Sequence, residues 1–196
     1  MDALVHGLQD ETGAPLKAGS TVVSVIVRDG MLYWMSVGDS RIYVLREDTM
    51  VPVTKDHNYR RELKEALARG DISREQFEKE SHTRKAEALT NYLGMGGLRR
   101  IEWNAQPFRL EDGDEILLCS DGLYKSLDVH QIKAMLLDNR ASVRVAAKRL
   151  VRMALDQAVK SQDNTTVILM EYHNTQSEED GDGTLLQLYE GISGRL

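Results

Sequence analysis

The order of predicted elements along this 196-residue chain indicates an α+β fold, with antiparallel sheets and helices packed on an outer face. Three features predict this class: a β-hairpin in the first third, a polar helical insertion in the middle, and two helices, the second with an apolar stripe, before a last strand. With 41% hydrophobic and 29% charged residues, the composition is that of one globular domain with a substantial core. We expect the domain to cover residues 1–173, followed by an acidic tail or linker at residues 174–196.

The first third of the chain alternates short strands with turns. Its runs of β-branched and apolar residues are typical of strands, and Asp29-Gly30 is a strong signal for the tight turn of a hairpin. The predicted strands are 21–27, 31–37, 41–45 and 49–53. We expect them to form one antiparallel meander.

Residues 57–90 are predicted to form a polar helical insertion between β segments. The spacing of apolar residues predicts a helix from Arg60 to Arg69, and Gly70 is a plausible helix stop. Ser73 is predicted to begin a second helix as its N-cap, with Gln76 completing a capping box. Such an insertion is expected at the surface.

The rest of the chain returns to strands and then to helices. The predicted elements are a strand at 101–110, a buried strand at 116–119, a helix at 128–138, a longer helix from Ser142 and a last strand at 166–171.

Charge and cysteine content limit the functional class. The formal net charge of −6 argues against a non-specific nucleic-acid binder, and no apolar run approaches the length of a membrane span. Cys119, the single cysteine, has no partner for an internal disulfide and cannot build a cysteine-based zinc site. We expect a cytoplasmic protein with Cys119 as a small apolar residue of a buried strand.

Three aspartates occupy similar positions at predicted strand ends. Asp39 and Asp121 each follow a strand, and Asp163 precedes one. Short carboxylates on a rigid sheet edge suit hard cations such as Mg²⁺ or Mn²⁺, which prefer oxygen ligands. Each aspartate alone is more often a turn residue, so the metal-site hypothesis depends on the three together.

Five motifs in order carry a resemblance to a known family. Gly-Asp-Ser-Arg at 38–41, Ser-Asp-Gly at 120–122 and Asp-Asn at 163–164 are similar to the signatures of the type 2C, metal-dependent serine/threonine protein phosphatases, the PPM family. Residues 54–57 and 89–94 resemble the segments that enter and leave the flap of that family. The resemblance covers residues 20–172.

The resemblance implies a β-sandwich flanked by helices, with two or three Mg²⁺ or Mn²⁺ ions bound between its sheets. It implies that Asp121 and Asp163 ligate the second metal, and that Asp39 and Asp121 hold a third, weaker one. The nucleophile is then a metal-activated water, without a catalytic protein side chain. Secondary site positions are Gly122, Asn164, Arg41, Ser120 and His57.

Some of these secondary positions have simpler interpretations. A polar surface role in the flap is the favoured interpretation for His57, with a general-acid role as the alternative. Arg41 is expected to form an ion pair or to stabilise a turn.

The predicted function is metal-dependent hydrolysis of phosphoserine and phosphothreonine in proteins, with a phosphorylated substrate from a serine/threonine kinase pathway. The alternative is a catalytically incompetent PPM-fold regulatory or protein-binding module, and a third class is a sandwich without metals. The family's Asp-Gly-x-Gly-Gly motif does not occur here, because Leu93 precedes the glycines of Gly94-Met95-Gly96-Gly97 and cannot ligate a metal. This absence predicts that the 196-residue chain alone is nearly inactive.

Overall fold

The computed structural model describes residues 1–138, 142–157, 163–174 and 189–190. The chain divides into two compact units, which are described separately below. The first unit comprises Met1–Ser24, Met35–Asp39 and Lys55–Trp103, and the second comprises Val25–Trp34, Ser40–Thr54 and Asn104–Leu196.

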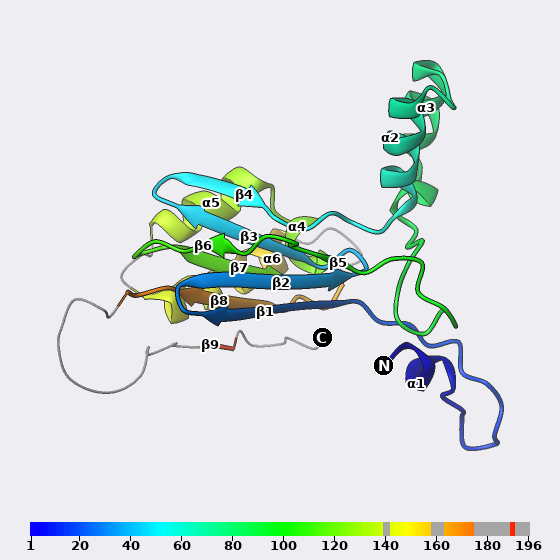
Figure 1. Cartoon of the computed structure of the whole chain (residues 1–196), viewed down its shortest axis with the longest axis horizontal. Helices are drawn as coiled ribbons and strands as arrows, with labels where there is room; N and C mark the ends of the chain where they lie inside the picture. Colours follow the sequence, from blue (N-terminus) through cyan, green and yellow to red (C-terminus); the bar gives the residue numbers. More distant parts are fainter. Residues whose placement is uncertain (139–141, 158–162, 175–188, 191–196) are drawn as a thin grey trace. The chain divides into compact units, whose positions relative to one another are not determined.

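Helices dominate the first unit, and they confirm the predicted helical insertion (Figure 1). Its elements outside the strands shared with the second unit are α1 (Asp2–His6), α2 (Tyr59–Arg69), α3 (Arg74–Ser81), a 3₁₀ helix η1 (Arg84–Glu87) and the short strand β5 (Glu102–Trp103).

Local capping explains where the helices of the insertion begin and end. The side chain of Asn58 accepts a hydrogen bond from the backbone N–H of Arg61 at the start of α2, and Gly70 ends this helix in the left-handed conformation with φ 79°. Ser73 caps α3 as predicted, through a 3.1 Å bond from the N–H of Gln76. The predicted capping box is not formed, because the amide of Gln76 donates to the Glu80 carboxylate at 3.1 Å, one turn further along the helix.

The first sheet contains β1 (Val22–Arg28), β2 (Met31–Val37), β5 and β6 (Phe108–Arg109). Strand β2 pairs antiparallel with β5 and with β6. Asp29 and Gly30, between β1 and β2, have φ angles of 52° and 70°, which the predicted tight hairpin turn requires.

The prediction of one continuous strand at 101–110 was wrong, because β5 and β6 are separate two-residue strands. Between them, the side chain of Asn104 forms the hydrogen bonds to β2. Its Oδ1 accepts from the N–H of Trp34 and its Nδ2 donates to the carbonyl of Leu32, both at 2.8 Å. Pro107 follows in the same interruption and has no N–H to donate to a ladder.

The second sheet has the strand order β4-β3-β7-β8-β9, and all its pairings are antiparallel. The predicted four-strand meander was wrong, because β1 and β2 belong to the first sheet whereas β3 and β4 belong to this one. Its strands are β3 (Arg41–Arg46), β4 (Thr49–Pro52), β7 (Glu115–Cys119), β8 (Val167–Glu171) and β9 (Tyr189–Glu190). Every residue of β7 is buried, so both faces of this strand are covered. Apart from residue 174 and β9, the predicted tail lies outside the described residues.

Three helices accompany the second sheet: α4 (Asp121–Tyr124), α5 (Val129–Leu137) and α6 (Val143–Gln157). Helices α5 and α6 confirm the two predicted helices, and the predicted apolar stripe of α6 is its buried face. Buried side chains of both helices, among them Leu136 and Leu150, share one core cluster with Leu117 and Leu169 of the sheet. Antiparallel sheets with flanking helices confirm the predicted α+β class. Among the residues that the structure describes, no helix is both long and apolar enough to cross a membrane.

Candidate metal site

Asp121 lies where the buried strand β7 ends and the helix α4 begins, with Ser120 as the N-cap between them. Its side chain is 22% exposed, and its Oδ2 accepts a hydrogen bond of 2.6 Å from the ammonium group of Lys125. The turn therefore presents a carboxylate at the end of a buried strand, with the ammonium group of Lys125 beside it.

The hydroxyl of Ser120 joins this turn to the segment that carries Asp163. Its Oγ donates to the carbonyl of Asn164 at 3.0 Å and accepts from the backbone N–H of Thr166 at 3.0 Å. Strands β7 and β8 also pair next to this point, with Cys119 opposite Val167. The segments that bear Asp121 and Asp163 are therefore held side by side.

Gly122 allows a close approach between the same two segments. A Cβ atom at this position would lie 2.6 Å from Thr165 Oγ1 and 2.7 Å from the carbonyl oxygen of Asn164. Real Cβ atoms do not approach other atoms so closely, so residue 122 has to be glycine for this packing. The structure thus gives Ser120, Gly122 and Asn164 a shared positioning role beside the two aspartates.

Asp163 is exposed, and its Oδ1 accepts from the N–H of the next residue, Asn164, at 2.8 Å. This local bond is typical of an aspartate in a turn, the alternative to metal ligation for Asp163. The second carboxylate oxygen, Oδ2, takes no part in this bond.

Asp39 belongs to the first unit and lies two residues after β2, which ends at Val37. It is buried, with 6% of its surface exposed. The preceding Gly38 has φ 104°, and a Cβ atom there would collide with Thr21. The position of Asp39 is thus set by a glycine that needs both a left-handed conformation and a close approach.

His57 contradicts the surface role favoured for it, because it is only 2% exposed. Its Nδ1 accepts from the N–H of Gly38 at 3.1 Å and contacts the Asn91 amide at 2.8 Å. Burial lowers the pKa of the imidazole, and this effect outweighs the charge of Glu102, which raises it. His57 is therefore a neutral, buried side chain at the start of the insertion.

Arg41 stacks its guanidinium on the ring of Tyr124, 3.5 Å from the ring centroid, and donates to the hydroxyl of Tyr43 at 3.1 Å. The stacking contact connects β3 to α4, the helix that begins with Asp121, whereas the bond to Tyr43 lies within β3. The ion pair or turn role expected for Arg41 stays a prediction.

The donor chemistry around Asp121 and Asp163 fits a hard divalent cation. Carboxylate oxygens on adjoining, packed turns are the ligands that Mg²⁺ and Mn²⁺ prefer. Within the described ranges, no group of three or more His, Cys, Asp or Glu side chains is clustered for a metal ion. Shared ligation by Asp39, Asp121 and Asp163 therefore stays a prediction.

Two residues that the structure brings into this region had no assigned role in the sequence. Lys125 lies four positions after Asp121, and this helical spacing signals a contact that could have been read from the sequence. Asn91 contacts His57 across 34 positions, and no local pattern indicates such a contact.

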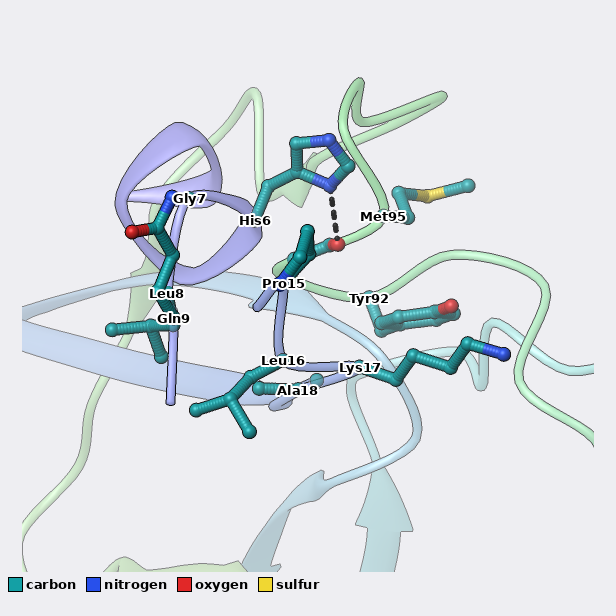
Figure 2. Close-up of a pocket in the computed structure, with 12 residues that line it drawn as sticks. His6, Gly7, Leu8, Gln9, Pro15, Leu16, Lys17, Ala18, Tyr92 and Met95 are labelled. Carbon is teal, nitrogen blue, oxygen red and sulfur yellow. Dashed lines mark hydrogen bonds between the residues drawn. The ribbon is translucent and has the colours of Figure 1, made fainter. Parts of the chain in front are cut away.

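The glycine-rich turn at 94–97 packs against α1. Figure 2 shows His6 of α1 against this turn, where its Nδ1 contacts the carbonyl oxygen of Gly94 at 3.0 Å. The N–H of Gly94 donates to Asp2 at 2.7 Å, also in α1. A cavity of about 570 Å³ lies beside these contacts, with Lys17 and Tyr92 in its wall.

Comparisons with known proteins agree with the five motifs. The pattern of the family described as Protein phosphatase 2C matches residues 6–162. The serine/threonine phosphatase stp of Listeria innocua is 32% identical over 162 residues, which cover 83% of this chain and 60% of the relative. The chain thus spans about 60% of the length of the first curated relatives that it matches.

Solved structures show the same fold. The PPM Ser-Thr phosphatase MsPP from Mycobacterium smegmatis, in complex with cacodylate, is 28% identical with a TM-score of 0.63, covering 86% of this chain and 68% of that one. The catalytic domain of PstP, in complex with two manganese ions, has a TM-score of 0.63 at 23% identity, covering 88% of this chain and 67% of that one. By its motifs, its fold and the matched residues 6–162, this chain belongs to the type 2C, metal-dependent protein phosphatase family.

Proposed function

We propose that the protein hydrolyses phosphoserine and phosphothreonine in proteins, with Mg²⁺ or Mn²⁺ as cofactor. The observation that supports this most is the packing of the Asp121 and Asp163 segments, which Ser120 joins through two bonds of 3.0 Å. In this proposal Asp121 and Asp163 hold one cation, and Asp39 is a ligand of a further, weaker one.

In this mechanism, the residues of the chain bind the cation and hold its ligands in place. Asp121 and Asp163 supply oxygen ligands, and Ser120 and Gly122 fix the separation of the segments that bear them. Bound divalent cations make a water nucleophilic near neutral pH and neutralise charge on the phosphoryl group. Lys125 balances the charge of Asp121 when no cation is bound.

A phosphorylated protein is the proposed substrate, and a serine/threonine kinase pathway is its proposed source. The relatives named serine/threonine phosphatases support this substrate class. We also propose a cytoplasmic location for the reaction.

The metal site is tested by Mn²⁺ titration of the whole chain, followed by electron paramagnetic resonance of the free ion. Asp121→Asn and Asp163→Asn should each weaken Mn²⁺ binding by about tenfold or more, since each removes a ligand. Asp48→Asn is the matched control, because Asp48 is an exposed carboxylate of the β3–β4 turn in the same unit. Equal Mn²⁺ affinity in all four proteins would contradict the site.

Hydrolysis is tested separately, by Mn²⁺-dependent release of phosphate from phosphothreonyl and phosphoseryl peptides. A phosphotyrosyl peptide is the control for substrate class. Because the sequence predicts that these 196 residues alone are nearly inactive, Mn²⁺-dependent hydrolysis by them would refute that prediction and support the enzymatic proposal. Mn²⁺ binding through Asp121 and Asp163 without any hydrolysis would instead favour a non-catalytic module that binds phosphoproteins.

A further inference from the structure

Three segments of the first unit meet at one buried point. They are the turn Gly38-Asp39 that follows β2, the start of the insertion at His57, and its end at Asn91. His57 and Asn91 are 2% and 3% exposed, so this junction is closed off from solvent.

His57 holds Gly38 by two bonds. Its backbone N–H donates to the carbonyl of Gly38 at 2.9 Å, and its ring Nδ1 accepts from the N–H of Gly38 at 3.1 Å. The peptide groups on both sides of the Gly38 Cα are thus fixed by one residue. The next residue along the chain is Asp39, so its place depends on these bonds.

The tautomer of His57 follows from its donors. Backbone N–H groups of Arg99 and Arg100 donate to Asn91 Oδ1, at 2.8 and 3.3 Å, so the other end of that amide, Nδ2, faces the ring. Nδ1 therefore receives donors from both Asn91 and Gly38, and it must be unprotonated. The proton of the neutral ring is on Nε2.

The surroundings of the ring agree with a neutral imidazole. Nε2 is buried without a hydrogen-bond partner among the described residues, and it lies 4.0 Å from Glu102 Oε1. That carboxylate is bound by Arg61 at 2.6 Å. Arg61 and Arg100 lower the pKa of His57, whereas Glu102 and Asp56 raise it. Burial is the largest effect and favours the neutral form.

The same residue anchors the base of the insertion. The carbonyl of His57 accepts from the N–H of Thr90 at 2.9 Å, and Tyr59 N–H donates to the carbonyl of Ala88 at 3.0 Å. The two ends of the insertion are therefore bonded to each other beside the ring that holds Gly38. The base of the insertion is therefore bonded to the backbone before Asp39.

We propose that His57 is a positioning residue, which fixes the backbone of Gly38-Asp39 and thereby places the Asp39 carboxylate for a divalent cation. This inference rests on the proposed function, because it takes Asp39 as a metal ligand. It connects three motifs of the chain, at 38–41, 54–57 and 89–94, through one side chain.

The test compares three variants of the whole chain by Mn²⁺ titration and by thermal unfolding. His57→Leu removes the acceptor for Gly38 N–H, and we expect Mn²⁺ affinity to fall about tenfold at temperatures where the variant is folded. His57→Asn places an amide oxygen near the position of Nδ1 and should restore most of that loss. His82→Leu is the matched control, because His82 belongs to the same insertion and its side chain is 76% exposed.

An Asp39→Asn variant separates the two proposals. If Asp39→Asn weakens Mn²⁺ binding and His57→Leu does not, the positioning role is overturned and the metal site stands. If Asp39→Asn has no effect on Mn²⁺ binding, Asp39 is not a ligand. The assignment of Asp39 to the weaker cation and the positioning role of His57 are then both wrong.

Nitrogen-15 NMR of the unmodified chain tests the junction without any variant. We expect the Nε2–H tautomer for His57 and a scalar coupling across the hydrogen bond from Gly38 N–H to Nδ1. A proton on Nδ1 would overturn the proposal, since Gly38 could then not donate to it.

Discussion

Replacing Ser120 with alanine removes the hydroxyl that joins the Asp121 turn to the Asp163 segment. Two hydrogen bonds are lost, from Oγ to Asn164 O and from Thr166 N to Oγ, each 3.0 Å long. At about 1 kcal/mol each, the variant should lose about 2 kcal/mol of unfolding free energy, or somewhat less where water replaces the serine. Urea unfolding followed by circular dichroism measures this loss.

The same variant should bind Mn²⁺ about tenfold more weakly, the size of effect typical of groups that orient metal ligands. Ser120→Thr keeps the hydroxyl and the extended backbone of the N-cap, with φ −78° and ψ 170°, so its affinity should remain close to that of the unmodified chain. Ser142→Ala is the control for stability alone, because Ser142 caps α6 through a 3.3 Å bond from Val145 N–H. It should cost about 1 kcal/mol and leave Mn²⁺ binding unchanged.

A loss of stability in Ser120→Ala with unchanged Mn²⁺ affinity would refute this reasoning, because the hydroxyl would then support the fold without placing the aspartates. Gly122→Ala gives an independent check. The added methyl would lie 2.6 Å from Thr165 Oγ1 and 2.7 Å from Asn164 O, so the two segments have to separate. Crowding of this kind typically costs about 1–3 kcal/mol, and it should also weaken Mn²⁺ binding.

Three further perturbations test charges of the chain. Lys125→Met should strengthen Mn²⁺ binding by about fivefold in a calorimetric titration, since a near-surface ammonium worth about 1 kcal/mol no longer competes for Asp121. Asp114→Asn should cost about 2 kcal/mol in urea unfolding, because this carboxylate, 1% exposed, pairs with Arg46 through bonds of 2.9 and 2.7 Å. The pKa of His57 is lowered below 6.5, so the folded state binds fewer protons than the unfolded state, and its contribution to stability should decline as the pH falls below about 6.5.

Each charge perturbation has a matched control. Lys133→Met removes an exposed ammonium on α5 and should leave Mn²⁺ affinity unchanged. Glu111→Gln changes a carboxylate that is 65% exposed beside Arg46, so its cost should stay below about 1 kcal/mol. His57→Asn should flatten the pH dependence of stability below 6.5, and an unaltered pH profile in this variant would assign the dependence to other groups.

Elements whose signals are local were predictable from the sequence. The hairpin turn at Asp29-Gly30, the helix stop at Gly70 and the cap at Ser142 depend on backbone angles and short-range bonds, and all three are confirmed. The apolar stripe of α6 likewise matches its buried face, because helical period alone decides which residues meet the core.

Features set by long-range partners were not predictable. The polar composition of the insertion indicated a surface position for His57, whereas its burial depends on Gly38 and Asn91, which lie 19 and 34 positions away. The interruption at 104–107 has the same origin, because Asn104 bonds to Trp34 across 70 positions. A single sequence carries no record of such pairings.

The glycines beside Asp39 and Asp121 show why the candidate site could be predicted only in part from the sequence. In a sequence, such a pair indicates either a turn that needs positive φ or a backbone that must be approached closely. Gly38 meets both needs, with φ 104° and contact with Thr21, while Gly122 lies in α4 and meets only the second, against Asn164 and Thr165. The motif therefore identified the positions, but the reason that each must be glycine came from the neighbouring segments. That reason at Gly122 is the packing of the Asp163 segment, so the glycine itself indicates that the segments bearing the two aspartates lie in contact.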